Sequence, residues 1–476
     1  PRPEWRVITD LVNSDPVRVK SDWAPFSAAG EVTLDTAGTT PVLRMPCLFA
    51  GKASDRAYWE RKVSLDLCSS RGIRFHFFCS DSSPVAGFSL ALRSGGGWYT
   101  ASFGPEGKGR WTTVRVDRSS TGIEGRPGGW AKIDAIRISV WRGGENNTEC
   151  VIANLGIEEE SGTVAVVRAE SAVSSGVSDA KSVCTYAGTV CRTARAAGLP
   201  AVMVSDADLA ADDLKTKRVV ILPYNPKMPD GVKDCLLSFV RSGGKLVSFY
   251  SHLPPELSDC AGIRTGDHVK EPSRGFFSSI RPAGGGLPGM PDVVGQASWN
   301  IIRAEPAGER ARIVAVWHDS RGQSTGEPAV VASETAVHVT HVLLQDDPEN
   351  KATFLLSLVG SLVPDVWQDA ASVQVGAAGQ FAGFPSLADA GRVPEPAAGT
   401  GSAVRAFLDE ANRRRQEAEQ LLASGRFIEA VQAAGRTRSA GVKAYCSAQQ
   451  GAGKEFRGFW CHSAFGPAGL SWDQAA

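Results

Sequence analysis

The stretch GIRFHFF at residues 72–78 decides the fold of the first part of the chain, because polar and apolar side chains alternate along a β-rich run. Similar short runs follow it, and clusters of Gly, Ser, Pro and Asp separate them. This spacing predicts an antiparallel β-sandwich (jelly roll) over residues 1–160, with one face of each strand pointing inward. The other runs of this kind occupy residues 87–93, 111–116, 136–141 and 150–155.

Residues 161–370 differ in character, since strand and helix signals alternate there. A strand of the buried type at residues 163–168 leads into a helix expected at about 179–197. This alternation predicts an α/β unit with a mainly parallel sheet. The remaining elements expected are strands at 201–204, 218–223 and 245–250, a helix at about 230–241 that ends at Gly243-Gly244, strands near 312–318 and 328–343, and a helix near 348–362.

The chain beyond residue 370 has a different composition. Residues 371–401 are rich in Ala, Gly and Pro with little periodicity, and we interpret them as a linker. Two apolar stripes at helical spacing within residues 402–450, interrupted at Ser424-Gly425, predict a helical hairpin. Three consecutive arginines at 413–415 have acidic neighbours on the same helix, which favours a solvated face over a basic binding patch.

Length, charge and composition exclude several classes of protein. The 476 residues carry 51 basic and 51 acidic side chains, so nothing in the net charge favours nucleic acid or an anionic membrane as a partner. No apolar run approaches 18 residues, so no membrane span is expected. The ten cysteines show no C-x-x-C spacing, which favours buried thiols over a disulfide scaffold or a metal site. The first residue is Pro1 and the last residues resemble a starting helix, so we expect a fragment at both ends.

The α/β unit offers one weak candidate for a nucleophile. The expected strand-to-helix turn after residues 245–250 contains Ser251 next to His252, but it lacks the glycines of a G-x-S-x-G turn. A catalytic Ser251 is therefore kept only as an alternative hypothesis, and no catalytic residue is assigned. His338 and His341 are three apart on an expected strand and should face opposite sides, which excludes joint metal binding.

Aromatic residues give the first functional hint, since seven of the 12 tryptophans lie in the first 141 residues. Sugars have flat C–H faces and many hydroxyls, and proteins bind them with exposed rings and polar groups at the rim. The alternative for any one of these rings is a place in the sandwich core. Adjacent Trp98 and Tyr99 must face opposite ways on a strand, so at most one is core. The candidate carbohydrate-binding residues are Trp59, Trp98, Tyr99, Asp55, Arg56 and Arg93.

The C-terminal segment carries a family resemblance. The stretch EFRGFWCH at residues 455–462 resembles the first barrel strand of glycosyl-hydrolase-like family 10 proteins, and residues 469–475 resemble the first barrel helix of that family. The resemblance implies that residues 451–476 begin a truncated TIM barrel whose catalytic carboxylates lie beyond the last residue. Trp460 and His462 would then line a sugar subsite.

Two further resemblances cover the upstream regions. The β-sandwich is similar to carbohydrate-binding, galactose-binding-like jelly rolls at residues 111–114 and 152–157. The α/β unit looks like a class I glutamine-amidotransferase-like domain with a flavodoxin-like sheet, at residues 221–225 and 240–245. The missing nucleophile at Tyr250-Ser251 argues against amidotransferase activity. The family implies a bacterial protein that is extracellular or periplasmic and has a polysaccharide partner. Two points remain open. One is whether the sandwich holds a structural calcium ion, the one cofactor considered, and the other is whether the α/β domain forms a homo-oligomer.

These observations favour a non-catalytic carbohydrate-recognition and structural region of a glycoside-hydrolase-like protein. Two alternatives stay open, and they belong to different classes. One is hydrolase or amidotransferase activity in the α/β domain, so whether the chain is an enzyme is left undecided. The other is a protein–protein assembly module.

Overall fold

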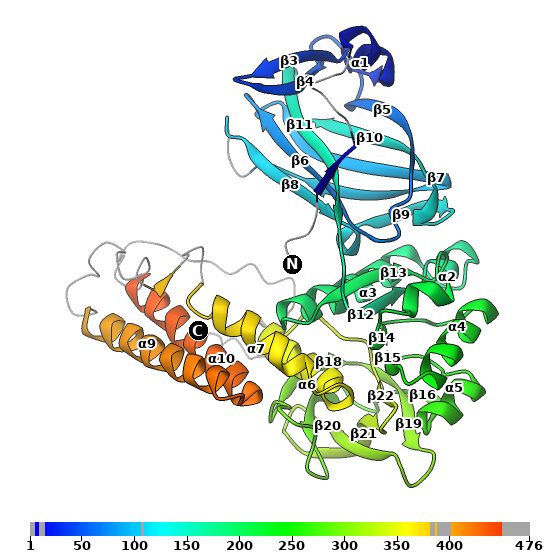
Figure 1. The fold of residues 1–476 in the computed structure, drawn as a ribbon, viewed down its shortest axis with the longest axis vertical. Coiled ribbons are helices and arrows are strands. Elements are labelled where there is room, and N and C mark those ends of the chain that lie inside the picture. Colours follow the sequence, from blue (N-terminus) through cyan, green and yellow to red (C-terminus); the bar gives the residue numbers. More distant parts are fainter. Residues whose placement is uncertain (1–4, 9–14, 106–108, 381–385, 388–400, 450–476) are drawn as a thin grey trace. The chain divides into compact units, whose positions relative to one another are not determined.

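The computed structural model describes residues 5–8, 15–105, 109–380, 386–387 and 401–449 (Figure 1). The protein is mostly β, with several sheets and some helices. The chain divides into two compact units. The first unit consists of Pro1–Cys191 and Ala201–Gly244, and the second consists of Arg192–Pro200 and Lys245–Ala476.

Two antiparallel sheets form a jelly-roll-like sandwich up to residue 159, which confirms the predicted β-sandwich (Figure 1). One sheet runs in the order β3 (Thr33–Ala37), β4 (Thr40–Cys47), β11 (Thr148–Glu159), β6 (Ser70–Cys79) and β8 (Thr112–Asp117), with β1 (Trp5–Val7) paired to β11. The other runs in the order β2 (Trp23–Ser27), β5 (Arg56–Leu65), β10 (Ile133–Arg142), β7 (Val85–Phe103) and β9 (Gly122–Pro127), and a short helix α1 (Pro16–Asp22) precedes β2.

The sandwich core follows from the alternation in β6. Phe75 and Phe77 are two residues apart and therefore point to the same face, where both are fully buried. The ring centroids of Phe77 and Phe88 lie 4.9 Å apart with an edge-on geometry, which joins β6 to β7 in the opposite sheet. Burial of a phenylalanine side chain stabilises the fold by about 2–3 kcal/mol. The two sheets are thus held by the apolar positions of the predicted pattern.

The first unit also contains three parallel strands of a larger sheet. Strand β12 (Val164–Arg168) lies between β13 (Ala201–Ser205) and β14 (Val219–Leu222), and it is parallel to both. Every residue of β12 is buried, as is typical of a strand that is covered on both faces. Helix α2 (Glu170–Ser174) follows β12 directly. The two longer helices predicted for this region are confirmed as α3 (Ala180–Ala196) and α4 (Asp230–Arg241).

The second unit is less parallel than the alternation predicted. Strand β15 (Lys245–Phe249) pairs in parallel with β22 (Ala336–Val339). Antiparallel strands then continue the sheet. The strand expected at 328–343 is broken at Ser333, whose Oγ accepts from the amide of Ala336 at 3.0 Å. The antiparallel strands run in the order β21 (Ser324–Ala332), β20 (Arg312–His318), β17 (Phe277–Pro282) and β18 (Val294–Ser298), and β16 (Ile263–Lys270) pairs separately with β19 (Asn300–Pro306).

Helices complete the second unit. After the short α5 (Pro255–Ala261), helix α6 (Pro348–Leu362) confirms the helix predicted near 348–362. Helix α7 (Val366–Ala377) extends into the segment expected to be a linker from residue 371, and Trp367 and Ala371 are among its buried residues. The predicted hairpin is confirmed as α9 (Gly401–Ala423) and α10 (Phe427–Gln449).

Two predictions concern other parts of the chain. The truncated barrel at 451–476, with Trp460 and His462, lies outside the described residues. No helix in the part of the chain that the structure describes combines the length and apolarity that a bilayer crossing needs.

Candidate functional site

The outer face of the sheet β2-β5-β10-β7-β9 carries aromatic and arginine side chains in a fixed register. Along β5, Ala57 and Trp59 are fully buried, so Arg56 and Tyr58 point to the outer face. The register places outer-face residues side by side in three rows. These rows are Arg56–Trp141–Gly87, then Phe26–Tyr58–Ser139–Ser89, then Ala24–Glu60–Arg137–Ala91.

Arginine and aromatic side chains alternate on this surface. The Cζ atom of Arg56 lies 4.8 Å from the ring centroid of Tyr58 and 4.9 Å from that of Trp141. The Cζ atom of Arg137 lies 4.0 Å from the Trp98 ring and 4.9 Å from the Tyr58 ring. Each such cation–π contact contributes about 0.5–1 kcal/mol at an exposed site. We call this surface the arginine–aromatic face, and it consists of Phe26, Arg56, Tyr58, Arg93, Trp98, Arg137 and Trp141.

Carboxylates hold two of the three arginines in place. Arg137 donates to Glu60 Oε1 through Nε, at 2.8 Å, and also through Nη2. Arg93 pairs with Asp134 and lies over Trp98, with 5.7 Å from its Cζ atom to the ring centroid. These pairs fix the guanidinium planes against the rings, so the face is ordered before any ligand arrives.

Two features keep part of this face open. Trp141 remains 37% exposed, and its Nε1 donates to Ser89 Oγ at 3.2 Å, which fixes the ring orientation. Gly87 on β7 lies opposite Trp141 on β10, and a Cβ atom placed at Gly87 would meet nothing within 4 Å. Phe26 is 41% exposed and stacks on Tyr58 at 5.0 Å between ring centroids. An accessible indole ring with free space beside it can accept the flat face of a sugar.

The structure separates the candidate residues into two groups. Trp98, Arg56 and Arg93 lie on the arginine–aromatic face, and Asp55 is exposed at its edge, just before β5. Trp59 and Tyr99 are fully buried, which corrects their assignment to a surface site. Trp59 Nε1 donates to the carbonyl oxygen of Gly30 at 2.8 Å, as is usual for a core indole.

The sequence argument left Phe26 and Arg137 out of the candidates. Both could have been found from strand parity, because Arg137 and Trp141 are four residues apart on β10 and therefore share a face. For neighbouring pairs such as Trp98–Tyr99, the prediction that at most one ring is core is confirmed.

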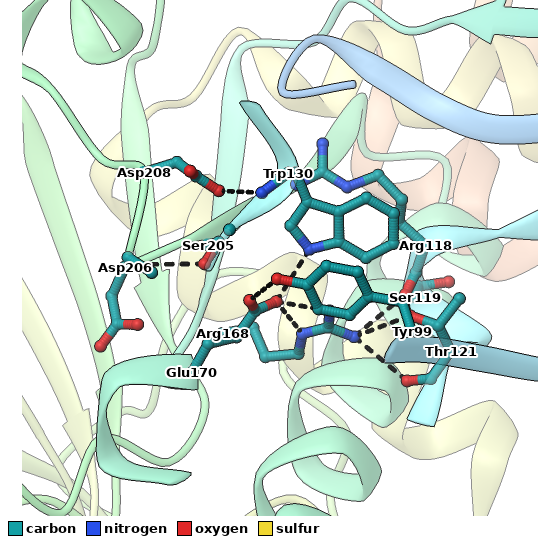
Figure 2. Close-up of polar contacts among 12 residues, drawn as sticks. Tyr99, Arg118, Ser119, Thr121, Trp130, Arg168, Glu170, Ser205, Asp206 and Asp208 are labelled. Carbon is teal, nitrogen blue, oxygen red and sulfur yellow. Dashed lines mark hydrogen bonds and ion pairs between the residues drawn. The ribbon is translucent and has the colours of Figure 1, made fainter. Parts of the chain in front are cut away.

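Tyr99 belongs instead to a closed polar network that joins the sandwich to the parallel strands within the first unit (Figure 2). Its hydroxyl donates to Glu170 Oε2 at 2.6 Å, and Trp130 Nε1 donates to Glu170 Oε1 at 2.9 Å. Arg168 forms an ion pair with the same carboxylate and donates to Oε1 through Nε, at 2.8 Å, and also through Nη2. The rings of Tyr99 and Trp130 stack with centroids 3.9 Å apart.

The electrostatics of this network favour the charged forms of its ion pair. Burial by itself raises the pKa of Glu170, but the Arg168 guanidinium and the donors from Tyr99 and Trp130 lower it below its ordinary value. Burial raises the pKa of Asp206, which follows β13 directly, to about 6, against the lowering effect of its hydrogen bonds from Ser171. Both carboxylates are buried, so we assign them to structure rather than to ligand binding.

The hydrolase hypothesis finds no geometric support at Ser251. Its Oγ is buried and donates to the carbonyl oxygen of Phe249 at 2.8 Å. The strained position of the turn is occupied by Tyr250, which has a φ of +40°. The Tyr250 ring packs edge-on against His341, with 5.2 Å between ring centroids. The strand-to-helix turn therefore presents a phenol where a hydrolase would carry its nucleophile.

The two histidines of the H-x-x-H stretch have separate partners, in line with the interpretation against a metal site. His338 Nδ1 lies 2.8 Å from Ser248 Oγ, and burial lowers the pKa of His338 to about 3, so the ring is neutral. His341 Nδ1 lies 3.0 Å from Gln296 Nε2. Throughout the described ranges, no three His, Cys, Asp or Glu side chains gather in a way that could hold a metal ion.

Comparisons with known proteins give partial similarities. No family model matches the sequence, and no curated protein matches it. A β-galactosidase from Rahnella sp. R3 is 18% identical with a TM-score of 0.32, over 42% of this chain and 31% of that one. An α-L-fucosidase from Paenibacillus thiaminolyticus is 18% identical with a TM-score of 0.33, over 44% of this chain and 34% of that one.

A third similarity is to a smaller protein. The family 11 carbohydrate-binding module of a Clostridium thermocellum cellulase is 17% identical with a TM-score of 0.25, over 33% of this chain and 96% of the module. The structures similar to this chain thus include glycoside hydrolases and carbohydrate-binding modules, each over less than half of the chain. The matched region spans about a third of the two enzymes.

Proposed function

We propose that this chain is a carbohydrate-recognition protein that binds polysaccharide on the arginine–aromatic face of its sandwich. The observation that carries the proposal is the exposed Trp141 ring, which Arg56 and Ser89 hold in place and which has open space at Gly87. Sugar C–H faces stack on such rings, and the polar groups beside them bind the hydroxyls.

The extent of the face suits a chain of sugars. Outer-face rings and guanidinium groups run from Phe26 on β2 to Trp98 on β7, across β5 and β10. Neighbouring strands are about 4.8 Å apart, so three strand spacings cover about 14 Å. This length fits an oligosaccharide segment better than a single monosaccharide, and polysaccharide is therefore the proposed ligand class.

The test is polysaccharide binding by the full chain with two matched tryptophan variants. We expect Trp141→Ala to weaken binding at least tenfold, measured by affinity gel electrophoresis and isothermal titration calorimetry. Trp111→Ala is the control, because Trp111 directly precedes β8 of the other sheet and is 46% exposed. Its ring centroid lies 5.5 Å from that of Phe78. The proposal is wrong if the wild-type protein binds no polysaccharide, or if both variants lose affinity equally.

We further propose that the role of this region is recognition rather than hydrolysis, and that it acts in an extracellular or periplasmic location. The buried hydroxyl of Ser251 and the family resemblance of the sequence support these two points. Release of new reducing ends from a bound polysaccharide would contradict the first point. Retention of the protein in the cytoplasm of its source cell would contradict the second.

A further inference from the structure

We propose that the polysaccharide is acidic, and that Arg56 pairs with a carboxylate or sulfate group on it. This inference rests on the proposed function, since it names the chemical class that the arginine–aromatic face selects. Neutral glucans would need only rings and hydroxyl partners, whereas this face also presents a cation without a counter-charge.

Arg56 differs from the other two arginines of the face. Arg137 and Arg93 are neutralised by Glu60 and Asp134. Arg56 forms no ion pair with any residue in the described part of the chain, and the preceding Asp55 lies beyond ion-pair distance of it. Arg56 is the one guanidinium of the face whose charge remains available to a ligand.

The rings beside Arg56 prepare it for a planar anion. Tyr58 and Trp141 lie at 4.8 and 4.9 Å from its Cζ atom, so two rings restrict the guanidinium. A guanidinium has five N–H donors in its plane, and stacked rings leave the edges of that plane available for hydrogen bonds. Those edges match the two oxygens of a carboxylate or the oxygens of a sulfate ester. Because the side chain is already held, less conformational entropy is lost on binding.

A second cation without an ion pair in the described part of the chain lies on the same face of β5. Lys62 projects from β5 on the outer face, is exposed, and has no ion pair within the described residues. It lies six positions from Arg56, which corresponds to about 20 Å along an extended strand. Two uncompensated cations on one strand face suit a polymer that carries repeated negative charges, and they add attraction that depends on salt concentration.

The experiment compares three polysaccharides with the full chain. Polygalacturonate supplies carboxylates, carrageenan supplies sulfate esters, and mixed-linkage β-glucan is the neutral reference. We expect wild-type protein to bind at least one acidic polymer tenfold more tightly than the glucan, with an affinity that falls as NaCl rises. Arg56→Gln should reduce the ratio of the affinities for the acidic polymer and the glucan to about one. The control is Arg264→Gln, on an exposed strand of the second unit, which should keep the wild-type ratio.

The outcomes separate this inference from the proposed function. Tighter binding of polygalacturonate or of carrageenan identifies which anionic group is recognised. If wild-type protein binds the neutral glucan as well as either acidic polymer, the inference is overturned and the proposed function stands. If it binds none of the three, both are overturned. If Arg56→Gln does not fold, the comparison among the polymers and the salt dependence of wild-type binding decide the question.

Discussion

Replacement of Glu170 by glutamine should destabilise the first unit strongly, because it removes the charge at the centre of the buried network. The glutamine has nearly the same shape, so the change tests electrostatics rather than packing. Its neutral amide leaves the Arg168 guanidinium, which is 1% exposed, without a counter-charge. Breaking a buried ion pair from one side costs about 3–5 kcal/mol.

The pH dependence has the sign of a carboxylate whose pKa is lowered in the folded state. Such a group stabilises the fold above its ordinary pKa of 4.5, and this contribution is lost as the pH falls below that value. The wild-type protein should therefore lose stability in acid, whereas Glu170→Gln should lack that part of the loss.

Urea denaturation of the full chain, followed by tryptophan fluorescence, measures the effect. The expected loss is about 3 kcal/mol or more at pH 7. The control is Glu31→Gln, which breaks the exposed pair with Lys20 and should change stability by less than about 1 kcal/mol. Addition of Arg168→Met to Glu170→Gln should recover part of the loss, because no buried charge then remains. A loss below about 1 kcal/mol for Glu170→Gln, or no recovery in the double variant, would refute the reasoning.

Three further predictions concern single positions. Because the pKa of Asp206 is raised from 3.8 to about 6, the contribution of Asp206 to the free energy of unfolding should fall by about 2 kcal/mol as the pH rises from 4 to 7, and Asp206→Asn should remove this contribution in urea titrations. Because the pKa of His338 is lowered from 6.5 to about 3, the contribution of this neutral ring to stability should decrease as the pH falls below 6.5. His338→Gln should reduce the dependence of the melting temperature on pH across that range. Gly72→Ala should lower the melting temperature, because its Cβ would lie 2.0 Å from the carbonyl oxygen of Val116, whereas Gly87→Ala should leave it unchanged.

Strand alternation predicted most of the sandwich because burial there repeats every second residue. The same parity could have separated Tyr58 from Trp59 and would have placed Arg137 on the outer face. Composition could not do this, since it counts tryptophans without indicating the direction in which they point.

The network around Glu170 could not be predicted from sequence for a different reason. Its members come from positions 99, 118, 130, 168 and 170, and only the tertiary fold brings them together. Strands β16 to β19 of the second unit were also missed, whereas the two strands near 312–318 and 328–343 were predicted and pair in antiparallel fashion as β20 and β21. Helix α7 was missed because its alanines and glycine resemble the composition of a linker. The burial of Trp367, which anchors the helix, is visible only in the tertiary fold.

The Glu170 network has a practical consequence for the sandwich as a stand-alone binding module. Cutting the polypeptide at residue 160, where the composition changes, would separate Tyr99 and Trp130 from the carboxylate that both rings bind. The freed piece would display two stacked aromatic rings and the Arg118 side chain to water, and it should aggregate. A piece that instead runs to Gly244, where the first unit ends, would keep the Glu170 network and helix α4 together.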